Sequence, residues 1–302
     1  MAAALAQRPA GRDDAASLHA EAWLLQARLD RRLGAPVLAL DLLRIAAGHL
    51  PPSLAAPERA ALCRELSLAY RDRGWFDEAL ALLDRAARLF RADERVEQLA
   101  EVRAEAGWIA ATEGDPQAAF DALSEALALW REQPPEGHAV EIWLGFAAAH
   151  AAMGRPLAAN LALERARGGL ARLATPRQRI PWLWEEARVL GRLGDWSNAA
   201  ARLRAIRAAV SDRPQALLVV TCEQAAVAAA RGHQGHAEAH RLLVALPALA
   251  RAAGLPPAAR REIEAWAAAP GSPAADSLFA LARYARYAPF DPFLPVPEAA
   301  GA

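Results

Sequence analysis

The chain has 302 residues, of which 54% are apolar and only 6% aromatic. That apolar fraction excludes disorder throughout, and its bias toward Ala and Leu favours helix over sheet. The 35 basic and 35 acidic residues cancel, so no net field recruits nucleic acid or an anionic membrane. Every basic residue is Arg, which we attribute to codon bias in a GC-rich genome and not to phosphate recognition.

The N-terminal segment, 1–16, has no basic stretch followed by an apolar core, so it is predicted to be flexible and not a secretory signal. The most apolar window, 216–230, is interrupted by acidic and amide side chains before it reaches the roughly 18–20 apolar residues that a membrane span needs. Cys63 and Cys222 have no cysteine neighbour at metal- or redox-motif spacing, so we expect both to be reduced and buried. These features predict a soluble cytoplasmic protein.

Glycines recur every 40 residues along the chain, and this is the first sign of internal repeats. They are Gly34, Gly74, Gly114, Gly154 and Gly194, followed by Gly232 two residues early. Small residues stand seven positions before each glycine and alanines five positions after it. Two antiparallel helices can approach closely only where facing side chains are small, and a tight turn favours Gly at the end of the first helix. The spacing therefore predicts stacked helical hairpins.

Apolar residues also recur nine and twelve positions after each of the first five glycines, as expected for the inner face of a second helix. In the sixth unit these offsets select Arg241 and Val244 where Leu and Ala stand in most of the other units. The sixth unit is therefore predicted to be a degenerate repeat or a cap.

In chain order, the sequence predicts a solenoid over 17–253, two capping helices over 254–287 and a proline-rich tail over 288–302. The connectors between helical pairs contain the expected Pro and Gly breakers. A terminal cap is required because a solenoid leaves its last apolar face uncovered. The tail either packs on the domain or remains open to partners. The six repeats are placed at about 20–53, 60–93, 100–133, 140–173, 180–213 and 218–251.

The pattern resembles the tetratricopeptide repeat, most closely over residues 66–86. Trp23 and Trp143 stand at the Trp position of that family, Tyr70 at its Tyr position and Pro51 at its closing Pro. The 40-residue period is similar to that of kinesin light chains and longer than the usual 34. The resemblance implies an all-α, right-handed α-α superhelix with no cofactor and no catalytic residues, which binds a protein or peptide in its concave groove.

Carried over position by position, the groove of the family implies contact residues on the first helix of each pair. These are Leu24, Arg28, Arg31, Arg64, Leu68, Arg71, Trp108, Trp184 and Arg188. Arginines held on rigid helices suit an acidic or C-terminal peptide segment. Alternatively, nearby acidic residues neutralise the same arginines and leave a solvated face; these are Glu65, Glu101, Glu105 and Glu185.

Three functions remain open on the sequence alone. The first is a protein-interaction scaffold or adaptor whose partner is a protein or peptide, with no nucleic acid and no membrane involved. The second is a ligand- or peptide-sensing regulatory module, similar to the repeat regions of bacterial peptide-pheromone receptors. The third is a metal-dependent activity at His233, His236 and His240, of which the last two have the i,i+4 spacing of helical metal ligands.

Overall fold

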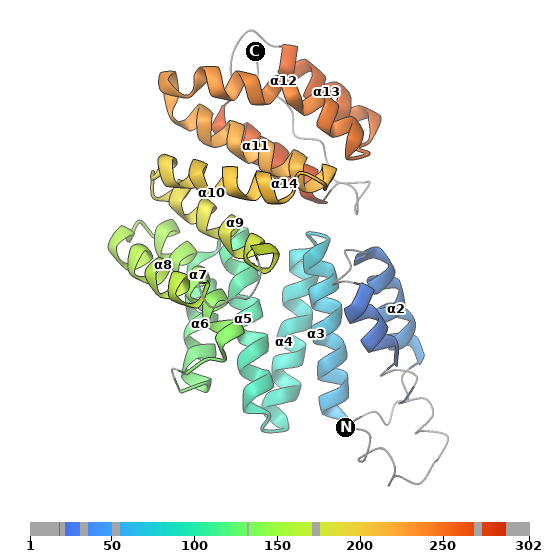
Figure 1. Ribbon diagram of the computed structural model, residues 1–302. Coiled ribbons are helices and arrows are strands. Elements are labelled where there is room, and N and C mark those ends of the chain that lie inside the picture. Colours follow the sequence, from blue (N-terminus) through green and yellow to red (C-terminus); the bar gives the residue numbers. More distant parts are fainter. Residues whose placement is uncertain are drawn as a thin grey trace. The chain divides into compact units, whose positions relative to one another are not determined.

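The computed structural model describes residues 18, 22–30, 36–49, 55–131, 133–170, 176–268 and 274–287 (Figure 1). All regular secondary structure in these ranges is helical. The segment 1–16, Arg31 and the tail 288–302 lie outside the described residues. Within them, no helix is both long enough and apolar enough to cross a membrane.

The helices alternate along the chain as first and second members of successive pairs. The first helices are 22–30, α3 (Ala56–Asp72), α5 (Val96–Glu113), α7 (Glu136–Ala152), α9 (Pro176–Arg192) and α11 (Pro214–Ala230). The second helices are α2 (Pro36–His49), α4 (Phe76–Ala92), α6 (Pro116–Leu129), α8 (Pro156–Leu170), α10 (Trp196–Ala209) and α12 (His236–Ala252). Two further helices follow, α13 (Pro257–Ala268) and α14 (Ala275–Tyr287).

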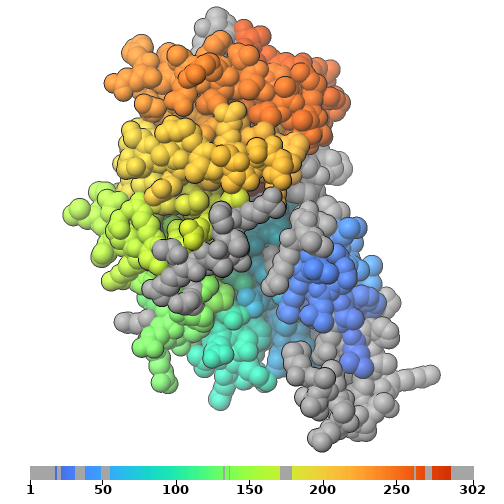
Figure 2. Space-filling model, viewed as in Figure 1, coloured from blue at the N-terminus to red at the C-terminus, as the bar shows by residue number. Residues whose placement is uncertain are grey.

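The chain divides into two compact units. Unit 1 comprises 1–109 with 121–133, and unit 2 comprises 110–120 with 134–302. In unit 1, α3 packs against α4 and α2. In unit 2, α7 packs on α8, α9 on α10, and α11 on both α12 and α14. The yellow and orange segments of unit 2 form adjoining bands on the face shown in Figure 2.

Small buried residues bring the two helices of each pair together. Ten of the residues seven positions before a turn glycine or five after it are at most 2% exposed: Ala27, Ser67, Ala147, Ala187, Ala225, Ala39, Ala79, Ala119, Ala159 and Ala199. Ala237, five positions after Gly232, is exposed. The apolar positions nine and twelve residues after the glycine are equally buried from Leu43 and Ala46 through Leu203 and Ile206. The periodic pattern therefore marks the core, as predicted.

Five of the turn glycines adopt a left-handed backbone conformation at the end of a first helix. Their φ angles lie between 62° and 89° for Gly74, Gly114, Gly154, Gly194 and Gly232, a region that costs an L-residue energy. After each of the first four, the next residue donates its N–H to the carbonyl five residues back at 2.9–3.0 Å, as in Trp75 to Tyr70 and Asp195 to Leu190. This hydrogen bond is the Schellman closure of a helix C-terminus.

The sixth pair corrects one prediction from the sequence. Arg241 and Val244 are both exposed, whereas Ala239, Leu243 and Leu246 are at most 1% exposed. These three lie 40 residues after the corresponding core positions of the fifth pair, so α12 carries a regular second-helix core. The expectation of a degenerate second helix came from counting from Gly232 and is wrong.

A longer turn explains this shift of register. The short helix η2 (Gly232–Gln234) lies between α11 and α12 and adds residues after the turn glycine. Gly235 then passes so close to α11 that a Cβ there would overlap the carbonyl oxygen of Ala228. Only glycine fits this position without moving the backbone.

Adjacent glycines in α8 allow a matched test of helix packing. A Cβ on Gly168 would contact nothing, but a Cβ on Gly169 would lie 2.5 Å from Cγ2 of Val140 on α7. We expect Gly168→Ala to raise the free energy of unfolding by about 0.5 kcal/mol through helix propensity. Gly169→Ala should lower it by about 1 kcal/mol because overpacking outweighs the same gain. Urea unfolding of both variants measures the difference, and equal shifts would contradict the close approach of the two helices.

His150 of α7 lies in an aromatic cluster within unit 2. The ring of His150 lies 5.5 Å from that of Phe120 and 6.3 Å from that of Phe146, between centroids. Burial lowers the pKa of His150, and the nearby charge of Arg155 lowers it further. The cluster therefore favours the neutral imidazole.

A depressed histidine pKa makes folding stability depend on pH. At a pH between the lowered pKa of His150 in the folded chain and its ordinary pKa, the unfolded chain binds a proton that the folded chain does not. The stabilising contribution of the neutral imidazole is therefore complete above the ordinary pKa and is lost as the pH falls through the folded pKa. We expect the melting temperature to be lower at pH 5 than at pH 7, and His150→Gln to reduce that difference. Thermal unfolding followed by circular dichroism checks this; an unchanged pH dependence in His150→Gln would show that other groups cause it.

Candidate functional site

The structure places the predicted contact residues on the first helices of both units. In unit 1, Leu24 and Arg28 lie on 22–30, Arg64 and Arg71 on α3, and Trp108 on α5. All five are partly exposed, and together they are called the unit 1 face. Leu68, on α3, is only 6% exposed and belongs to the core, so it is unavailable as a contact residue.

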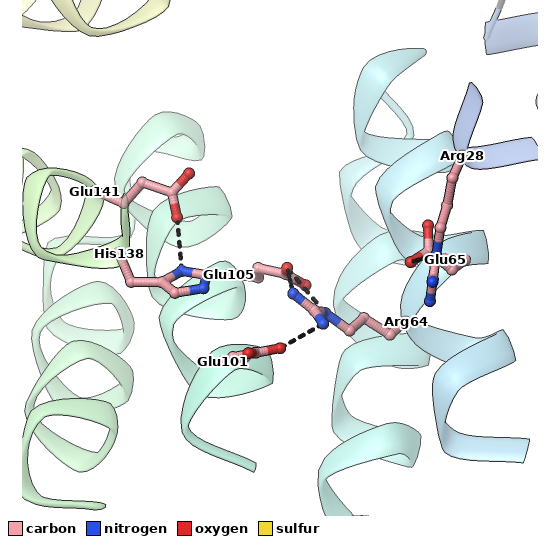
Figure 3. A network of polar contacts seen from close by, with 7 residues as sticks. All are labelled: Arg28, Arg64, Glu65, Glu101, Glu105, His138 and Glu141. Carbon is pink, nitrogen blue, oxygen red and sulfur yellow. Dashed lines mark hydrogen bonds and ion pairs between the residues drawn. The ribbon is translucent and has the colours of Figure 1, made fainter. Parts of the chain in front are cut away.

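Glutamates of the next first helix neutralise Arg28 and Arg64 of the unit 1 face (Figure 3). Arg28 Nε donates to Glu65 Oε1 at 2.6 Å. The guanidinium of Arg64 binds Glu105 Oε1 through Nε and Nη2, at 3.0 and 2.6 Å, and Glu101 Oε2 through Nη1 at 2.5 Å. The prediction that nearby acidic residues satisfy these arginines is therefore confirmed.

The two arginines differ in what they can still offer a partner. Arg64 uses all three guanidinium nitrogens, and its side chain is only 22% exposed. Burial would lower its pKa, but Glu105, Glu101 and Glu65 together raise it, so the charge is permanent. Arg28 is 43% exposed, and among the described residues only its Nε is engaged. Its terminal nitrogens can therefore reach a further acceptor.

In unit 2, the predicted residues Trp184 and Arg188 meet at a buried carboxylate on α11. Glu223 is 3% exposed and accepts from Trp184 Nε1 and from Arg188 Nη2, the latter at 2.6 Å. Arg188 also donates to Glu185 at 2.6 Å. Trp184, Arg188 and Glu223 are together called the unit 2 face.

One carboxylate position recurs along the repeats. Glu65, Glu105, Glu185 and Glu223 each stand nine residues before a turn glycine. The first-helix arginines bind these carboxylates, in most cases on the following first helix. The spacing was visible in the sequence, because the acidic residues share a fixed offset from the glycines.

The last described helix contributes two arginines that sequence reasoning did not include. Arg286 of α14 lies 4.9 Å above the ring of Trp184, measured to its centroid, and 3.7 Å from Glu223 Oε1. Arg283 of α14 donates from Nη2 to both oxygens of Glu113 at 3.0 Å. No repeat spacing connects α14 to these partners, so no sequence pattern could have identified them.

The other chemical candidates have little support in the geometry. His233, His236 and His240 are exposed, and the first two rings lie 5.4 Å apart. Across the part of the chain that is described, no three His, Cys, Asp or Glu side chains are gathered as metal ligands. Cys63 and Cys222 are free and buried, as predicted, and burial raises the pKa of both thiols. Neither is poised as a reactive thiolate.

Comparisons with known proteins bear on the fold. No family model and no curated protein matches the chain. A Rap protein complexed with Competence and Sporulation Factor is similar at a TM-score of 0.67 and 12% identity, over 82% of this chain and 68% of that one. The apo form of RapI is similar at 0.53 and 13%, over 90% and 76%. A putative kinesin light chain of Podosopora anserina with TPR-like repeats has a TM-score of 0.44 and 23% identity, over 64% and 96%. The chain has an all-α, tetratricopeptide-type helical-repeat fold.

Breaking the Arg64–Glu105 pair should cost more than breaking an exposed one. Glu105 is 8% exposed and the Arg64 side chain 22%, so Glu105→Gln leaves a largely desolvated guanidinium with less compensation. We expect this substitution to lower the free energy of unfolding by about 2 kcal/mol. The loss should be smaller than for an isolated buried ion pair, because Glu101 still binds Arg64. Asp84→Asn removes the exposed i,i+4 partner of Arg88 and should change it by less than about 0.5 kcal/mol. Urea titrations measure both, and similar losses would refute the special role of the buried carboxylate.

Proposed function

We propose that this chain is a protein-interaction scaffold that binds a peptide segment or helix of a partner on its first helices, and that it works by binding and not by catalysis. The observation that carries the proposal is the unit 1 face, where successive first helices present partly exposed Leu, Arg and Trp side chains. Rigid helices that hold such side chains at fixed spacing supply contact residues with little ordering cost. Trp and Arg are the types most often found at the centre of binding surfaces.

Within that surface, we assign the main contacts to Arg28 and Trp108. The terminal nitrogens of Arg28 suit a carboxylate of the partner, because an arginine fork holds carboxylates with directed hydrogen bonds. Trp108 supplies apolar area with a polar N–H, so it suits a neighbouring apolar side chain of the same segment. Arg64 acts differently, since its three nitrogens are taken by Glu101 and Glu105. It holds the helices and does not recruit the partner.

A second candidate is a ligand-sensing regulatory module. It is favoured by the likeness to two Rap proteins over 82% and 90% of the chain, one of them complexed with Competence and Sporulation Factor. The two functions differ in the size of what binds. A sensor responds to a small ligand alone, whereas a scaffold requires a folded or extended protein partner.

Affinity capture with matched variants tests the scaffold. The full-length wild-type chain, the double variant Arg28→Ala with Trp108→Ala, and Arg88→Ala would each be used as bait in native lysate. Arg88 is an exposed arginine on the second helix α4 of the same unit, so it controls for loss of charge. We expect at least one protein to be retained by the wild type and by Arg88→Ala and to be depleted about tenfold by the double variant, in line with the loss of about 1.4 kcal/mol at central contacts.

Other results of the capture would count against the proposal. Equal retention by all three baits would show that the partner binds elsewhere. If no protein is retained, but a size-fractionated extract of small molecules and peptides raises the melting temperature of the chain, the sensing function replaces the scaffold.

A further inference from the structure

The last described helix, α14, packs alongside α11 (Figure 1), and α13 packs on α12. Besides Tyr284, the buried residues of α14 are Leu278, Leu281, Ala282 and Ala285, each at most 1% exposed. These are spaced i, i+3, i+4 and i+7, the arrangement by which an amphipathic helix docks on a receptor surface. They share one core with the apolar side of α11.

Two arginines hold α14 to three different first helices. Arg286 contacts the ring of Trp184 on α9 and the carboxylate of Glu223 on α11, while Arg283 binds Glu113 on α5. Gln215 on α11 adds a hydrogen bond from Nε2 to the carbonyl oxygen of Arg286 at 2.9 Å. The helix therefore covers part of the unit 2 face, which contains the predicted contact residues Trp184 and Arg188.

We infer that the unit 2 face is a docking site for a basic amphipathic helix, that α14 is its resident occupant, and that a helix of a partner protein with the same pattern exchanges with it. The inference rests on the proposed function, since exchange requires a partner that binds first helices. The pattern is a row of small and leucine side chains at i, i+3, i+4 and i+7, with arginines at i+5 and i+8 corresponding to Arg283 and Arg286.

The chemistry of the site selects the sign of the incoming charge. A guanidinium at the position of Arg286 meets an aromatic face and a buried carboxylate, both of which favour a cation. An acidic side chain at that position would face Glu223, which is 3% exposed, and would be rejected by like charge. The unit 2 face thus takes a basic helix, in contrast to the carboxylate that Arg28 suits on the unit 1 face.

A peptide competition on the full-length chain tests the inference. The probe is a fluorescent peptide of residues 274–287. Because α14 is tethered, its local concentration is of the order of 1 mM, so the wild-type chain should bind the probe weakly. The double variant Arg283→Glu with Arg286→Glu weakens the resident helix and should bind the probe at least tenfold more tightly than the wild type. Fluorescence anisotropy measures both affinities.

Two controls test whether probe binding depends on the contacts of Arg283 and Arg286. A probe that carries the same two Arg→Glu changes should not bind the double variant. Arg251→Glu, at an exposed arginine of the Arg251–Glu264 pair on α12 and α13, should leave the affinity of the chain for the probe at the wild-type value. Probe binding that does not depend on the arginines of the peptide would overturn the inference.

Hydrogen exchange keeps the inference testable if the double variant fails to fold. In the wild type, the amides of α14 should exchange at least tenfold faster than those of α11, because an exchangeable helix opens as a separate unit. If α14 and α11 exchange at the same rate, α14 is a fixed part of the core and the inference is wrong.

The two proposals fail separately. If the double variant Arg28→Ala with Trp108→Ala loses a partner but the peptide competition is negative, the scaffold function stands and only the exchange of α14 is excluded. If the peptide competition is positive but no captured partner depends on Arg28 and Trp108, the proposed site on the unit 1 face is excluded and the unit 2 face remains a docking site.

Discussion

The close approach of paired helices at buried alanines is the constraint on which the rest of this structure depends. Ala39, Ala79 and their counterparts through Ala199 are fully buried, and the preceding helices contribute buried small residues such as Ala27 and Ser67. Alanine is also the best helix former, since it loses no side-chain entropy. One residue type therefore serves helix formation and packing together. Because the inner faces are fixed in this way, the remaining sides of the first helices are open to vary, and there the chain carries the partly exposed Arg28, Arg64 and Trp108.

The repeat could be predicted from the sequence because its core positions and its turn glycines share one period. The prediction was wrong in the sixth pair, where the two signals separate by two residues. Glu223 and Ala225 keep the spacing set by Gly232, whereas Ala239 and Leu243 keep the 40-residue spacing of the core. A helical turn can lengthen at low cost, but a displaced core residue would expose its side chain. The core spacing is therefore the more reliable guide wherever the two disagree.

The candidate site was predictable only in part. The positions on the first helices came from the resemblance to the repeat family, and the neutralisation of Arg28 and Arg64 was expected from acidic residues near the predicted contact positions, although the bound Glu65 and Glu105 lie 37 and 41 residues away in sequence. The role of α14 could not be predicted, since Arg283 and Glu113 are 170 residues apart in sequence. Helical periodicity shows which side of α14 is apolar but not which surface it covers. Such contacts depend on tertiary packing, which a repeat pattern does not encode.

The polar contacts of Glu223 make replacement of α14 less costly than its burial suggests. When Arg286 leaves, Trp184 and Arg188 still donate to Glu223, so no buried carboxylate is left without compensation. Glu113 is 28% exposed and can turn to water. The apolar row of α14 is different, because uncovering it and the facing side of α11 would expose surface that nothing else satisfies. Departure without replacement is therefore opposed by the apolar contacts, while exchange for a helix of the same pattern restores them. That asymmetry keeps the open state of the site rare and favours exchange of α14 for a helix of the same pattern.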